Sequence, residues 1–202
     1  MAAIFRVFQD DDFQSNIHIS SESIPQLRTI IDNIALLLVN NPAIRHSYLC
    51  VLRQTTLNNM PATQQEDAIL TDFFLRRFPE VRLMVMSHQV LACVHRQSAP
   101  RRLYLNWQLA ITLKGYDTSV FSVYMDNAVM LVIVAIFHEL AHLLWGDVHS
   151  PKLGTPPHLI FPQYHYWKNG HLVPPPEWGE SGLAVEGCLF EGIISPVYNE
   201  GF

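Results

Sequence analysis

The chain has 202 residues, of which 49% are hydrophobic and 15% are charged, and its formal net charge is -5. This length fits a single domain over residues 1–202 with a substantial core, and the apolar composition excludes a disordered protein. The acidic balance gives no general basis for binding nucleic acid, so we expect no nucleic-acid partner.

The cysteines and the first residues indicate an intracellular protein. Cys50, Cys93 and Cys188 are odd in number and widely spaced, which fits free thiols in a reducing compartment better than a disulfide framework. The N-terminus lacks the basic start and apolar core of a secretory signal. We therefore predict a cytoplasmic protein and leave its oligomeric state open.

The N-terminal quarter predicts one long helix between two apolar segments. Residues 4–8 favour a short strand. Residues 23–40 predict a helix, because apolar residues recur at three- and four-residue spacing and Ser23 is a suitable N-cap. Residues 47–53 lean toward a strand.

The next part of the chain predicts further helices around a strand. Residues 64–77 have a helical apolar pattern, and residues 81–95 favour a helix slightly over a strand. Residues 101–106 alternate and predict a strand. Asn106 can then cap a short helix at residues 107–114.

The sequence His-Glu-Leu-Ala-His at residues 138–142 ends a long apolar run and predicts a metal site. On a helix, residues four apart lie about 40° apart around the axis, so His138 and His142 can reach one ion. Glu139 is rotated by about 100° from His138, which lets its carboxylate approach a water beside the ion without being a ligand. This is the geometry that a zinc hydrolase needs.

The apolar stretch at residues 128–145 is long enough to raise the question of a membrane span. It carries two histidines and a glutamate, each of which is costly in lipid, and no second span is available to shield them. We therefore expect a central buried helix and no membrane association.

Residues 150–177 combine seven prolines with several aromatic residues, which prevents a long helix. Their apolar content favours a loop over the active site, forming a wall of the substrate cleft, rather than a linker. Candidate donors to a reaction oxyanion in this loop are Tyr164, His165, Tyr166, His158 and His171. A final helix is predicted at residues 180–191, where small residues allow close packing against the metal helix.

Residues 138–146 resemble the metal helix of zincin-superfamily zinc peptidases, especially the ImmA/IrrE type metallopeptidases. Residues 180–184 resemble the helix that carries the glutamate ligand in the gluzincin-like branch of that superfamily. The resemblance implies an α+β fold: a mainly helical single domain of zincin type, with a small mixed sheet and a central buried metal-binding helix.

The resemblance also implies roles for individual residues. His138 and His142 would be Zn²⁺ ligands, Glu139 the general base and Glu180 the third ligand, with Glu186 as the alternate. The implied activity is that of a zinc metallopeptidase that cleaves a peptide or protein substrate with a zinc-activated water.

Other interpretations stay open at this point. Asp147, five residues past His142, could be a ligand or could orient an imidazole. The protein could be a catalytically silent zincin-fold binding or regulatory protein. It could also be a zinc-dependent tailoring enzyme that acts on a small hydrophobic or peptide substrate.

Overall fold

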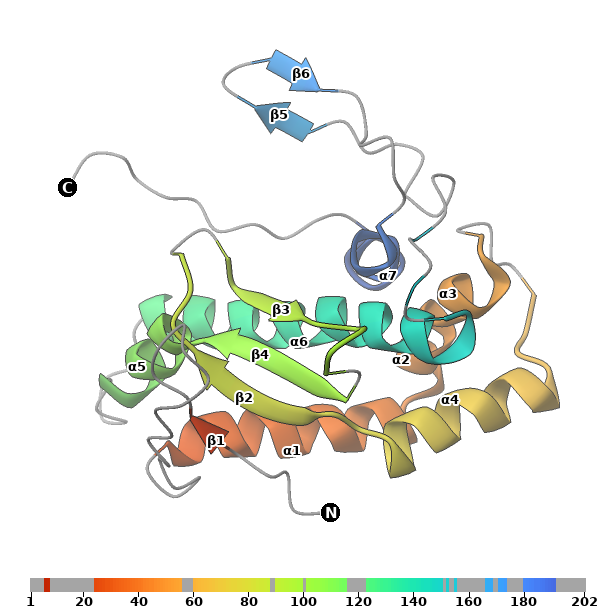
Figure 1. Ribbon diagram of the computed structural model, residues 1–202, viewed down its shortest axis with the longest axis horizontal. Helices are drawn as coiled ribbons and strands as arrows, with labels where there is room; N and C mark the ends of the chain where they lie inside the picture. Colours follow the sequence, from red (N-terminus) through yellow and green to blue (C-terminus); the bar gives the residue numbers. More distant parts are fainter. Residues whose placement is uncertain are drawn as a thin grey trace.

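The described part of the chain is a mainly helical α+β fold with a small mixed sheet (Figure 1), as the sequence predicts at this coarse level. The computed structural model describes residues 6–7, 24–55, 60–87, 90–99, 101–115, 123–150, 152, 155, 166–168, 171–173 and 180–191.

The sheet contains four strands in the order β1-β2-β4-β3. These are β1 (Arg6–Val7), β2 (Glu80–Met84), β4 (Arg102–Asn106) and β3 (Ala92–Val94). β1 and β4 pair with β2 in parallel, whereas β3 pairs with β4 antiparallel and forms one edge of the described sheet. The strands predicted near the N-terminus and at residues 101–106 are confirmed.

The helix favoured at residues 81–95 is wrong, because this segment contains most of β2 and all of β3. Val81, Arg82 and Leu83 are all buried in β2. A strand that is covered on both faces shows no alternation of apolar and polar residues, so periodicity cannot distinguish it from a buried helix.

The first long helix, α1 (Pro25–Asn40), is confirmed, with one correction at its start. Ile24, and not Ser23, occupies the N-cap position, and no side chain caps the helix there. Ile24 is instead buried at 1% exposure in the core. Packing therefore decides where this helix begins.

The strand tendency at residues 47–53 is also wrong, since two short helices, α2 (Pro42–Ser47) and α3 (Leu49–Arg53), cover this segment. Asn41 Oδ1 accepts hydrogen bonds from the backbone N–H groups of Ala43 and Ile44, which starts α2 immediately after α1. Tertiary burial then outweighs the β propensity of the apolar residues that follow.

The helices predicted at residues 64–77 and 107–114 are confirmed as α4 (Gln64–Arg76) and α5 (Trp107–Gly115). Thr63 and Glu66 form a capping box at the start of α4. Asn106 Oδ1 accepts a hydrogen bond from the backbone N–H of Gln108 at 3.0 Å, as expected for the cap of α5.

The long helix α6 (Val123–Val148) lies along the sheet and packs against β3, β4 and α5. The last helix, α7 (Ser181–Phe190), is seen end-on above α6 in Figure 1, so the two axes cross steeply. α7 packs closely on α6 and also contacts α3. The buried Tyr48 hydroxyl donates to the Phe137 carbonyl at 2.9 Å and ties α6 to the core immediately before its histidines.

Within the described residues, α6 is the one helix long and apolar enough to cross a membrane. In the most apolar 18-residue stretch of this helix, 67% is buried inside the protein. A core helix passes the same test of length and composition, so α6 is weak evidence for a membrane span.

Most of the predicted loop at residues 150–177 lies outside the described residues, and so do the side chains of its five candidate oxyanion donors. The loop does contain two short strands, β5 (Tyr166–Lys168) and β6 (His171–Val173), which pair antiparallel. Its placement over the site stays a prediction.

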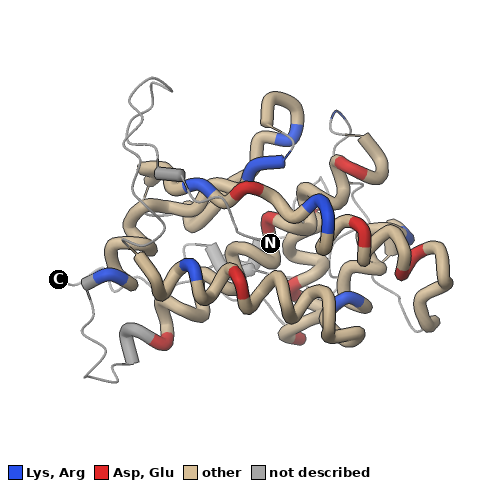
Figure 2. Tube along the Cα trace, turned by 90° about the horizontal axis from the view of Figure 1, so that it is seen from below, with Lys and Arg blue, Asp and Glu red and all other residues tan. Residues whose placement is uncertain are grey.

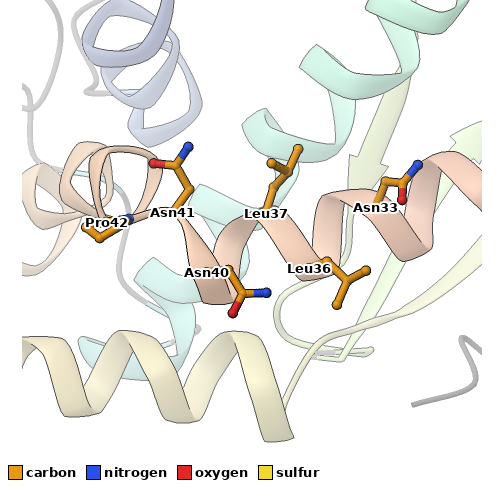
Figure 3. A pocket seen from close by; sticks show the side chains of 6 residues that line it. All are labelled: Asn33, Leu36, Leu37, Asn40, Asn41 and Pro42. Carbon is orange, nitrogen blue, oxygen red and sulfur yellow. The ribbon is translucent and has the colours of Figure 1, made fainter.

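Two surface features are visible in the described part. Basic and acidic residues are interspersed along the chain trace (Figure 2). An open pocket on α1 and the start of α2 has no titratable group among its lining residues (Figure 3), which are Asn33, Leu36, Leu37, Asn40, Asn41 and Pro42.

Candidate metal centre

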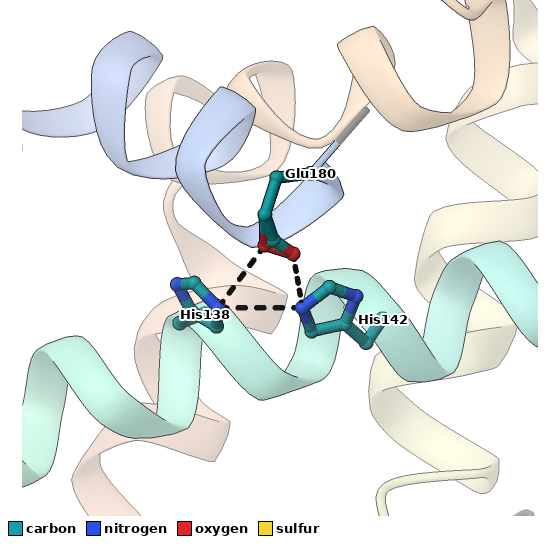
Figure 4. A group of neighbouring side chains, drawn as sticks. All are labelled: His138, His142 and Glu180. Carbon is teal, nitrogen blue, oxygen red and sulfur yellow. Dashed lines mark hydrogen bonds and ion pairs between the residues drawn. The ribbon is translucent and has the colours of Figure 1, made fainter. Parts of the chain in front are cut away.

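Three side chains from two helices converge on one point (Figure 4). α6 presents His138 and His142 one turn apart, and Glu180 reaches them from the residue that precedes α7. One ligand atom from each residue lies within 4.8 Å of the other two. These are the three residues that the sequence analysis favours as metal ligands.

The position of Glu180 leaves its carboxylate free to face the histidines. Glu180 is the N-cap residue of α7, yet its side chain makes no capping hydrogen bond. One carboxylate oxygen contacts His142 Nε2, and the other, Oε2, lies 3.4 Å from His138 Nε2. Oε2 is buried and accepts no hydrogen bond. A buried carboxylate oxygen of this kind needs a positive partner.

The opposite nitrogens of both imidazoles have partners on α7. Glu186 Oε1 lies 2.6 Å from His138 Nδ1, and Ser181 Oγ lies 2.9 Å from His142 Nδ1. If each Nδ1–H donates to that partner, both Nε2 atoms are directed toward Glu180, and the two Nε2 atoms are 3.3 Å apart. Acceptors behind metal-binding histidines commonly fix the tautomer and orientation of the ring in this way.

Glycine at position 182 allows α7 to approach the site closely. A Cβ atom built on Gly182 would lie 2.4 Å from ring atoms of His138, which is too close for any real contact. Any larger residue would therefore displace the imidazole or the helix. The small residues of this helix could be predicted from the sequence, but the contacts of Ser181 and Gly182 with particular histidines could not.

Opposite charges in the cluster shift its pKa values. Burial alone would lower the pKa of His138, but its contacts with the Glu180 and Glu186 carboxylates outweigh it and raise that pKa to about 10. Burial alone would raise the pKa of Glu180, but its contacts with His138 and His142 hold that pKa well below its usual range. Without an ion, a proton at His138 Nε2 therefore supplies the positive charge that the site requires.

The metal-free protein is expected to lose stability as the pH rises from about 6.5 to about 10. The folded chain raises the pKa of His138 to about 10, above its unfolded value of about 6.5. Protonation at His138 therefore stabilises the fold fully below about pH 6.5, and this contribution is lost as the pH rises through about 10. Among the described residues, the titratable groups that face His138 are Glu180, Glu186, Glu139 and His142.

Urea unfolding at several pH values, with and without zinc, measures this effect. A bound divalent ion replaces the His138 proton, so the zinc-loaded protein should lack the alkaline loss. The variant His138→Gln is the control. Its metal-free form should lack the part of the alkaline loss of stability that comes from deprotonation of His138. An identical pH profile for the parent and the variant would contradict the assigned protonation.

Glu139 follows His138 on α6 and is buried at 8% exposure. Burial raises the pKa of its carboxyl, and the positive charges of His142 and His138 oppose this shift. It forms no hydrogen bond or ion pair with another described residue.

The other residues considered as ligands lie elsewhere. Asp147 forms an ion pair with Arg77 and is not part of the cluster. Glu186 contacts the nitrogen of His138 that faces away from Glu180, so the geometry favours Glu180 over Glu186 as the third ligand.

The donor set could hold a divalent metal ion. Two imidazoles and one carboxylate are ligands that zinc accepts, and a catalytic site usually offers three protein ligands. No protein-family model, curated protein or solved structure matches this chain. The interpretation of the site therefore depends on its own geometry.

Proposed function

We propose that this protein is a zinc-dependent hydrolase of zincin type, and specifically a metallopeptidase. The observation that carries the proposal is the convergence of His138 Nε2, His142 Nε2 and a Glu180 oxygen, with partners behind both rings. Such a set binds a divalent cation and leaves a coordination position for water. The three cysteines are free, which supports an intracellular, cytoplasmic site of action.

In the proposed mechanism His138, His142 and Glu180 would hold the ion. Zinc, when bound, would supply a Lewis acid and a water whose pKa is lowered toward about 7. Glu139 would be the general base that accepts a proton and returns it to the leaving amine. Glu186 and Ser181 keep the two imidazoles oriented. A peptide or protein is the proposed substrate.

Metal removal tests this function. The purified protein is expected to contain one zinc ion per chain and to cleave an unstructured protein such as casein. Dialysis against a chelator should abolish cleavage, and stoichiometric zinc should restore it. Asp147→Ala is the matched control, because it removes a carboxylate from the same helix but outside the cluster, and it should retain its zinc.

Two results would contradict the proposal in different ways. Absence of bound zinc, or zinc that is retained after all three ligands are replaced, would contradict the metal site. Full zinc occupancy without cleavage of casein or of a broad peptide library would favour the binding or regulatory interpretation.

A further inference from the structure

Arg96 lies in the turn after β3, and one nitrogen of its guanidinium group has no partner among the described residues. Its Nη1 atom is buried and has no hydrogen bond. No ion pair or hydrogen bond joins Arg96 to any other described residue, whereas every other partly buried or buried arginine among the described side chains has a carboxylate partner. A guanidinium carries five donors, and a buried donor without an acceptor is costly. This arginine therefore requires an explanation.

Arg96 lies beside the metal helix. Its methylene groups pack against Gly146 of α6, where an added Cβ would come within 3.3 Å of Arg96 Cδ. Gly146 is seven residues after Glu139, so the two positions share one face of the helix. The charge of Arg96 also acts on the Glu139 carboxyl and opposes the rise in its pKa.

The edge strand β3, which precedes Arg96, also contacts α6. α6 packs against β3, and Cys93 of that strand is close enough to Glu139 for the two to interact electrostatically. Glu139 and Arg96 thus carry opposite charges in one region, but they form no ion pair with each other. The unpaired Nη1 donor of Arg96 therefore belongs to a side chain that packs on the same face of α6 as the proposed general base.

We propose that Arg96 binds a carboxylate of the substrate and forms an anion subsite on the face of α6 that also carries Glu139. The inference rests on the proposed hydrolase function for its location in the reaction. The planar guanidinium matches a carboxylate through two parallel hydrogen bonds, which gives geometric selection as well as attraction. The carboxylate belongs to the C-terminus of a peptide or to an acidic side chain within it.

Peptide pairs distinguish these two sources. The first pair is an N-acetylated hexapeptide with a free C-terminal carboxylate and the same peptide as a carboxamide. The second pair is a peptide blocked at both ends that contains either glutamate or glutamine at one position. The zinc-loaded parent, Arg96→Gln and Arg96→Lys are compared on all four peptides. Arg101→Gln removes an exposed arginine five residues further along the chain and is the matched control.

Arg96→Gln should lower kcat/KM by about 10- to 100-fold for the preferred carboxylate peptide and leave its neutral partner nearly unchanged. Arg96→Lys should be intermediate, because an ammonium group cannot form the paired hydrogen bonds. Equal losses on the charged and neutral peptides would overturn the proposal in favour of a structural role for Arg96. Full activity of Arg96→Gln on all four would also overturn it.

A second measurement does not depend on hydrolysis. The ¹⁵N signal of Arg96 Nε, assigned by its loss in Arg96→Lys, should shift on addition of the carboxylate peptide but not of the neutral one. A shift without any cleavage would contradict the hydrolase and leave the anion subsite intact. Cleavage without a selective shift would contradict the subsite alone.

Discussion

Replacing Glu139 with glutamine is expected to lower kcat by roughly 100- to 10,000-fold while the bound zinc is retained. Glutamine keeps the shape of the side chain but could not accept the proton of a water in the proposed mechanism. Glu139 is not in the His138–His142–Glu180 cluster, so the ligand set is unchanged by the substitution. Steady-state peptide hydrolysis and zinc content, measured on the same preparation, test both parts of this expectation.

Glu191→Gln is the matched control for this experiment. Glu191 is exposed at the C-terminal end of α7, and its substitution removes the same charge far along the chain from Glu139. It should leave kcat within about twofold, as expected for a surface change. If Glu139→Gln were as active as Glu191→Gln, Glu139 would not be the base.

Replacing Glu180 with glutamine is expected to reduce zinc affinity far more than the same change at Glu186. Glu180 faces both Nε2 atoms and would donate directly to the ion, whereas Glu186 contacts Nδ1 of His138 and acts through that ring. Loss of a residue that orients a ligand typically costs roughly 10- to 100-fold in affinity. Loss of a ligand itself should exceed this range.

Competition with a zinc-binding dye measures both affinities at one pH. The comparison is informative because each variant exchanges one buried or nearly buried carboxylate for an amide of the same size in the same part of the fold. A larger loss for Glu186→Gln would reverse the two roles. Equal losses would show that neither carboxylate alone completes the ligand set.

The helical part of the site could be predicted from the sequence because its geometry is local. The relation between His138, Glu139 and His142 follows from the helix repeat, and the apolar residues around them indicate a buried helix. The long helices α1, α4, α6 and α7 could be predicted for the same reason. Their patterns extend over several turns and are marked by caps or breaking residues.

The remaining features depend on contacts between distant segments. Periodicity could not distinguish β2 from a helix, because the sheet buries consecutive residues such as Arg82 and Leu83. The choice between Glu180 and Glu186 depends on how the chain crosses α6, because this decides which carboxylate faces the Nε2 atoms of both histidines. Arg96 gave no signal in the sequence, since an arginine in a turn usually lies on a solvated surface.

The convergence of α6 and α7 on one ligand set has a consequence for the folded chain as a whole. A divalent ion held by both helices would cross-link two segments that are separated in the sequence by a long proline-rich stretch. The ligands converge only when the C-terminal helix is docked on α6, so ion binding and the attachment of that helix would be thermodynamically coupled. The concentration of the free ion would then affect the stability of the folded protein as well as its proposed activity.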